Sequence, residues 1–138
     1  MLFFAALTTL VSAPAATAAA PDQQGSPTVG TWNFTVIEYR QIPPTVRHTT
    51  FVFKSNGALT LISGSGEPGS GTWAGHGTII SFQFKHILPN PPGGYVMGEE
   101  TGTVTCNQLN ASGSSTTYND SGQSTATYKV VFTGSKQK

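Results

Sequence analysis

The chain has 138 residues, a one-domain length that can bury a single hydrophobic core without metals or disulfides, and its one cysteine excludes an intramolecular disulfide. Only 9% of the residues are charged, and the net charge is +1. Since the lysines and arginines are scattered and form no continuous basic stripe, the composition argues against nucleic acid as a partner.

The first eighteen residues have the pattern of a secretory signal peptide. The apolar run from Leu2 to Val11 is too short to cross a bilayer of roughly 30 Å as a helix, and Ala16-Thr17-Ala18 has the small-residue spacing of a cleavage site. We therefore expect a signal peptide over 1–18, a flexible leader over 19–29, a barrel domain over 30–134 and a tail over 135–138. The expected mature protein is secreted and has no membrane contact after signal removal.

Short alternating segments begin at Gly30. In the first, Thr31 to Arg40, alternate positions place three apolar side chains and Glu38 on one face. Pro43 and Pro44 cannot donate ladder hydrogen bonds, so residues 41–47 are expected to form a loop at a barrel mouth. A second strand is expected over 48–54 and a third over 58–63, joined by an Asn-Gly hairpin.

The clearest alternation lies in the fifth expected strand. Residues 64–70 are expected to form a flexible turn, followed by a short fourth strand that contains Trp73 and ends at residues 75–77. In the next segment Ile80, Phe82, Phe84, His86 and Leu88 share a face, which indicates a strand buried on one side.

Three further strands complete the pattern. They are expected from Tyr95 to about Cys106, from about Leu109 to Tyr118 and from Ser124 to Thr133. Eight strands joined by short turns predict an all-β fold, a single eight-stranded antiparallel up-and-down barrel, because closure removes unpaired edges.

The titratable residues offer few candidates for chemistry. Glu38 ends an aromatic face and His86 lies near the proline loop at 89–94, so each could orient a ligand or move a proton at the barrel mouth. One of the adjacent pair Glu99 and Glu100 is expected to face the lumen, since neighbours on a strand point to opposite sides. Cys106 is expected to be a buried small hydrophobe. No histidine has metal-ligand spacing, so no metal or cofactor is expected.

The aromatic side chains are expected to build the barrel interior. Most of them are expected to be core, and several could line a cavity for an apolar ligand. The candidate ligand-binding residues are Trp32, Phe34, Phe51, Phe53, Trp73, Phe82, Phe84 and Tyr128.

Two Gly-Thr-Trp motifs support a family resemblance. Gly30-Thr31-Trp32 at the start of a first strand, followed by an eight-stranded meander, resembles the calycin superfamily of lipocalins, avidins and related barrels. Phe51-Val52-Phe53 with Gly57, followed by Gly69-Ser70-Gly71-Thr72-Trp73, is similar to small exported barrel proteins common in actinobacteria. The resemblance implies that Trp32 packs across the closed end of the barrel.

Three hypotheses for function follow. The first is an exported, monomeric barrel that binds a small, largely apolar molecule in its lumen, oriented by Glu38, His86 or Tyr128. The alternative is a cofactor-free cyclase or isomerase of a hydrophobic metabolite, in which Glu38 or His86 moves a proton. A further alternative is a hydrolase inhibitor or other interaction module that uses the proline loops.

Overall fold

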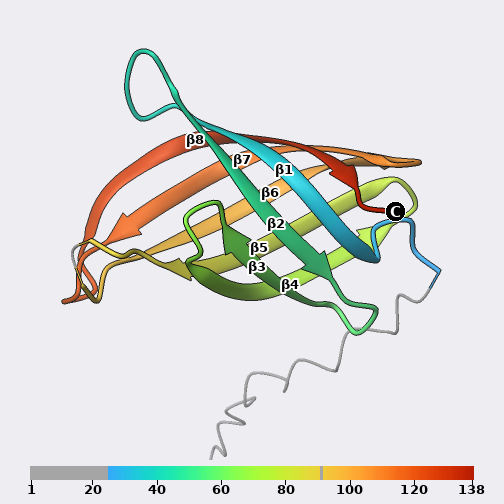
Figure 1. The fold of residues 1–138 in the computed structure, drawn as a ribbon, viewed down its shortest axis with the longest axis horizontal. Coiled ribbons are helices and arrows are strands. Elements are labelled where there is room, and N and C mark those ends of the chain that lie inside the picture. The colour runs from blue at the N-terminus through green and yellow to red at the C-terminus, as the bar shows by residue number, and fades with distance from the viewer. Residues whose placement is uncertain (1–24, 91) are drawn as a thin grey trace, which may run out of the picture.

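The chain forms a closed antiparallel barrel of eight strands, each paired with its neighbours in sequence order and β1 paired with β8 (Figure 1). This computed structural model describes residues 25–90 and 92–138. The predicted fold class is confirmed, and the architecture is consistent with a calycin-like fold. The predicted signal peptide and residues 19–24 of the predicted leader lie outside the described residues.

All eight strands that the alternation predicted are present. Two begin several residues earlier than expected: β2 extends into the predicted loop at 41–47, and β4 begins inside the predicted turn at 64–70. The last strand continues two residues beyond the expected domain end. The strands are β1 (Gly30–Glu38), β2 (Thr45–Phe53), β3 (Ala58–Ser63), β4 (Pro68–His76), β5 (Ile79–Ile87), β6 (Tyr95–Thr105), β7 (Gln108–Tyr118) and β8 (Ser124–Lys136).

Alternation along each strand sends one set of side chains into the lumen and the other to the outside. In β1 the buried positions are Trp32, Phe34, Val36 and Glu38, as the period of two predicts. The same parity holds in β5 and β8. Residues 25–90 and 92–138 contain no helix that is long and apolar enough to cross a membrane.

Gly69 explains why β4 begins earlier than its sequence suggests. A Cβ built on Gly69 would lie 2.7 Å from the carbonyl oxygen of Lys85, and one on Gly71 would lie 1.9 Å from that of Gln83, so β4 and β5 come too close there for a side chain. The glycines and proline of 66–69 read as a turn, but here glycine permits a close approach between strands.

The turn between β6 and β7 corrects one prediction. Cys106 was expected to be buried, but it is exposed and has a φ of 50°. The register pairs Thr105 with Gln108, so Cys106 and Asn107 alone form the turn, outside the barrel wall. A short turn requiring positive φ therefore determines the position of this thiol.

One end of the barrel is closed by its own tryptophans. Trp32 is 0% exposed and its Nε1 donates to the carbonyl of Thr28 at 2.8 Å. Trp73 Nε1 donates to the carbonyl of Lys54, also at 2.8 Å, from the hairpin that follows β2. Thr28 is buried beside this end, so the end of the predicted leader packs on the barrel. Trp32 lies where the family resemblance implied.

Candidate functional site

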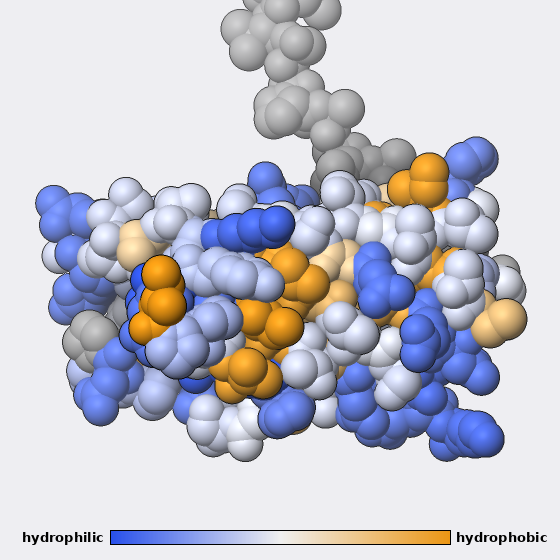
Figure 2. Space-filling view, turned by 90° about the horizontal axis from the view of Figure 1, so that it is seen from above, coloured by the Kyte–Doolittle hydropathy of each residue, from blue (hydrophilic) through white to orange (hydrophobic). Residues whose placement is uncertain are grey.

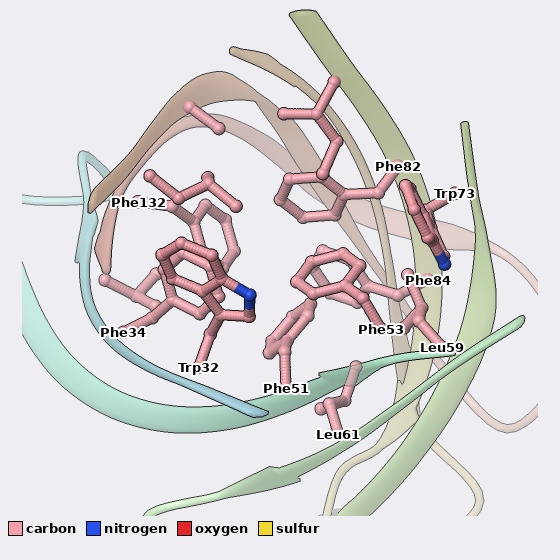
Figure 3. Close-up of a cluster of buried hydrophobic side chains, with 14 of the residues drawn as sticks. Trp32, Phe34, Phe51, Phe53, Leu59, Leu61, Trp73, Phe82, Phe84 and Phe132 are labelled. Carbon is pink, nitrogen blue, oxygen red and sulfur yellow. The ribbon is translucent and has the colours of Figure 1, made fainter. Parts of the chain in front are cut away.

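The middle of the lumen is filled with aromatic rings from several strands. Phe51 of β2 lies at their centre, with ring centroids 5.2 Å from Phe34, 5.7 Å from Phe82, 5.5 Å from Phe84 and 5.7 Å from Phe132. All four pairs meet edge to face, which is a favourable packing geometry. Figure 3 shows the rings converging from opposite sides of the wall. This part of the lumen is a packed core.

A cavity of about 400 Å³ lies above these rings, at the end opposite the tryptophans. Its volume falls within the usual range for small-molecule sites. Its floor is apolar, and its rim contains charged and hydroxyl side chains. The floor consists of Phe51, Leu61, Phe84, Val96 and Phe132.

Glu38 organises one side of the rim. Glu38 is the last residue of β1, and the pairing of β1 with β2 brings Arg47 beside it. Arg47 Nε donates to Glu38 Oε1, while Arg40 Nη1 lies 3.9 Å from Glu38 Oε2. Glu38 is only 7% exposed, so this carboxylate is buried with two guanidinium partners.

Tyr128 of β8 completes that side of the rim. The Arg40 guanidinium carbon lies 4.7 Å from the centroid of its ring, a cation–π contact. Burial, together with the negative charge of Glu38, raises the pKa of Tyr128 to about 12. The phenol therefore keeps its proton at neutral pH and can donate or accept a hydrogen bond.

His86 lies on the other side of the cavity. Its ring is stacked on Phe84 with centroids 6.2 Å apart, and its Nδ1 lies 3.1 Å from the carbonyl oxygen of Ile87. Burial lowers the pKa of His86, which favours the neutral imidazole. With Nδ1–H donating to the carbonyl, Nε2 is left as an acceptor.

The mouth cavity brings together five of the ten predicted site residues. They are Glu38, Phe51, Phe84, His86 and Tyr128. Trp32, Phe34, Phe53 and Phe82 lie in the packed core instead, and Trp73 packs on Phe53 with ring centroids 5.7 Å apart. For all ten, a functional role remains a prediction.

Arg40 and Arg47 are rim residues that the sequence interpretation missed. They read as scattered surface charges, and Arg47 fell in a predicted loop. One signal in the sequence could have identified them: Arg40 and Arg47 flank the proline loop. The antiparallel pairing of β1 with β2 brings the two flanks of that loop together.

Glu100 is a second buried carboxyl in the lumen, and the structure identifies it as the inward member of the Glu99–Glu100 pair. It is 2% exposed, and within the described residues neither carboxyl oxygen has a hydrogen-bond partner. A Cβ on Gly113 would lie 2.6 Å from Glu100 Oε2, so this glycine leaves room for the carboxyl. Burial raises the pKa of Glu100 to about 8, so the protonated form predominates at pH 7.

The outside of the barrel offers two other surfaces. A hollow of about 840 Å³ crosses β4 to β7, lined outwardly by small and hydroxyl side chains such as Ser81, Thr101 and Ser112. The β1–β2 loop projects from the barrel (Figure 1), and its Ile42 is 100% exposed. An interaction module would use this loop.

Apolar side chains also gather on the wall near that loop. The register places Val46, Ile37 and Val131 side by side on the outer faces of β2, β1 and β8, and Val46 is exposed. Figure 2 shows apolar side chains in a cluster near the middle of the molecule, surrounded by hydrophilic ones. The cluster is small, as is common on protein surfaces.

Within residues 25–90 and 92–138, no three His, Cys, Asp or Glu side chains are grouped so that they could hold a metal ion. A scan against protein-family models finds no match to this chain, and a search of curated proteins finds none either. The geometry of the mouth is therefore the guide to function.

Proposed function

We propose that this protein is an exported, calycin-like barrel that binds a small molecule with an apolar body and one polar end. The observation that carries the proposal is the cavity of about 400 Å³ at the mouth, with an apolar floor and a polar rim. Aromatic rings fill the lumen below it, so a ligand would rest on Phe51 and Phe84 rather than enter deeply. Export rests on the signal-peptide pattern of residues 1–18.

At Glu38 the geometry supports binding more than proton transfer. A general base must face its substrate, whereas Glu38 is buried and engaged by Arg47 and Arg40. Its arrangement suits a residue that positions the two arginines. Neutral His86 and protonated Tyr128 can each make a hydrogen bond to a bound molecule without any transfer of charge.

A cavity-filling substitution tests the proposal. Thr49 lines the cavity, so Thr49→Trp should fill part of it, whereas Thr60→Trp adds the same side chain on the exposed outer face of β3. Titration with the neutral fluorophore 1-aminoanthracene should show saturable binding at one site in the unsubstituted protein. Thr49→Trp should weaken binding about tenfold or more, and Thr60→Trp should not.

Two results would overturn the proposal. One is the absence of saturable binding by the unsubstituted protein. The other is equal binding by both tryptophan variants, which would place the fluorophore outside the mouth. Circular dichroism and thermal unfolding of each variant show whether the barrel is intact, and Leu61→Trp provides a second cavity-filling change if Thr49→Trp fails to fold.

A further inference from the structure

The rim of the mouth is electrically asymmetric. On the β1–β2 side, the guanidinium groups of Arg40 and Arg47 share one carboxylate, that of Glu38. Two positive charges and one negative charge leave this side with a net charge of +1. A guanidinium has five N–H donors, and Arg47 donates to Glu38 through its Nε.

Both guanidinium groups remain accessible to a ligand. The side chain of Arg40 is 38% exposed and that of Arg47 is 52% exposed, whereas Glu38 is almost fully buried beneath them. Arg40 is also held over the ring of Tyr128, which limits the positions that its head can adopt. The buried carboxylate thus holds two cations at the edge of an apolar cavity.

The neighbouring turn of the rim, between β3 and β4, would repel an anion. Glu67, between β3 and β4, accepts hydrogen bonds from the hydroxyls of Ser63 and Ser65, and these lower the pKa of its carboxyl. It therefore remains anionic at neutral pH. His86, on β5 across the cavity from Glu38, is mainly neutral, because burial lowers its pKa. The ammonium group of Lys85 lies over the ring of Tyr95, and that of Lys129 lies near the ring of Tyr39. Both lysines occupy exposed positions on the outer wall.

We propose that the ligand of this mouth is an amphiphilic carboxylate, whose head is bound by Arg40 and Arg47 and whose apolar body lies on the aromatic floor. This inference rests on the proposed ligand-binding function and specifies its ligand class. Guanidinium groups bind carboxylates through paired, charge-assisted hydrogen bonds, so an acid should be preferred over an alcohol of the same chain length. Repulsion by Glu67 disfavours a head placed at the β3–β4 turn, so the head lies toward Arg40 and Arg47.

Competition between matched ligands tests the preference. Decanoate, decan-1-ol and decyltrimethylammonium share one alkyl chain and differ in charge. Each should be titrated below its micelle concentration against bound 1-aminoanthracene at pH 7.5. We expect decanoate to displace the fluorophore at a concentration at least about tenfold lower than decan-1-ol, and the cationic amphiphile to be weakest.

Variants locate the origin of that preference. In the Arg40→Met/Arg47→Met double variant the ratio between decan-1-ol and decanoate should fall toward 1, while Lys129→Met, which removes a cation on the outer wall, should leave it unchanged. Glu38→Gln removes the competing carboxylate and should raise the ratio. If the double variant fails to fold, Arg47→Met alone should lower the ratio, and added salt should lower it in the unsubstituted protein.

The outcomes separate this inference from the proposed function. Equal displacement by decanoate and decan-1-ol would overturn the carboxylate preference and leave apolar binding at the mouth standing. A preference that survives in the double variant would also overturn the assignment to these arginines. If 1-aminoanthracene itself does not bind, the proposed function fails and the ligand class fails with it.

Discussion

The closed end and the mouth of the barrel differ in what occupies their inward-facing positions. At the closed end, Trp32 and Trp73 are buried and each indole N–H is bonded to a backbone carbonyl. At the mouth, inward positions of β1 and β5 hold Glu38 and His86 around a cavity. One barrel thus uses one end for packing and leaves donors and acceptors available at the other.

The two buried glutamates show the same contrast. Glu38 is surrounded by arginines at the mouth, so its charge has partners. Glu100, on β6 within the lumen, has no hydrogen-bond partner among the described residues, and burial favours its neutral form. A carboxyl can therefore be accommodated in this barrel either by pairing or by keeping its proton, and only the first leaves charges at the surface for a ligand.

The largest expected effect comes from the closed end. Trp32→Ala removes a fully buried indole and leaves a cavity, so the free energy of unfolding should fall by about 3–5 kcal/mol. Chemical denaturation measures this loss, with Thr31→Ala on the same strand as the control. If the closed end only packs, the folded variant should still bind 1-aminoanthracene at the mouth. A loss below about 1 kcal/mol would contradict the assignment of this end to stability.

The second effect concerns Glu100 and depends on pH. Below its ordinary pKa of 4.5 the carboxyl is protonated in both folded and unfolded chains. Between 4.5 and about 8 the unfolded chain releases the proton while the folded chain keeps it. The free energy of unfolding should therefore decrease as the pH rises through this window, by up to about 1.4 kcal/mol per pH unit.

Glu100→Gln removes that dependence and should stabilise the protein by a few kcal/mol at pH 8, with little change at pH 4.5. Denaturation at pH 4.5, 6 and 8 provides the comparison. Glu99→Gln is the matched control, because it removes the same charge from the exposed outer face of the same strand. A pH dependence shared by both variants would mean that Glu100 is not the group responsible.

The third effect lies at the boundary between core and mouth. A Cβ built on Gly98 would lie 2.4 Å from Cζ of Phe84, whose ring belongs both to the packed lumen and to the cavity floor. Gly98→Ala should cost about 1–3 kcal/mol of stability by overpacking. It should also weaken 1-aminoanthracene binding if the ring moves toward the cavity.

Two further variants check that mechanism. Adding Phe84→Leu to Gly98→Ala removes the ring atom that clashes and should restore part of the stability. Met97→Ala, at the exposed neighbouring position of β6, should have a smaller effect. If the double variant is less stable than the summed effects of the two single substitutions predict, the contact with Phe84 is not the cause of the lost stability.

The sequence was sufficient for the architecture because alternation and turn chemistry are local. The inward sets of β1, β5 and β8 follow from a period of two, and Asn56-Gly57 marks its hairpin. Glycines made the start of β4 and the inward face of β6 harder to predict. Gly69 read as a turn residue although it belongs to β4, and Gly98 and Gly102 gave β6 no burial pattern from which the inward glutamate could be identified.

The candidate site was harder to predict because it depends on register between strands. Glu38 was correctly placed at the end of an inward face, but its partners could not be found without the pairing of β1 with β2. Arg47 lies opposite Val36 in that pairing, which brings its side chain to the carboxylate. A charge that appears isolated in sequence therefore belongs to a cluster of three charges around a buried carboxylate.

The smallest expected effect concerns the β1–β2 loop and tests whether the binding site ends at the strands of the rim. Ile42 at the tip of the β1–β2 loop is fully exposed, so Ile42→Ser should change stability by no more than about 0.5 kcal/mol. Because Ile42 does not line the cavity, affinity for 1-aminoanthracene should also be unchanged in the same titration. Weaker binding would show that the loop folds over a bound molecule, and the site would then extend beyond the strands that form its rim.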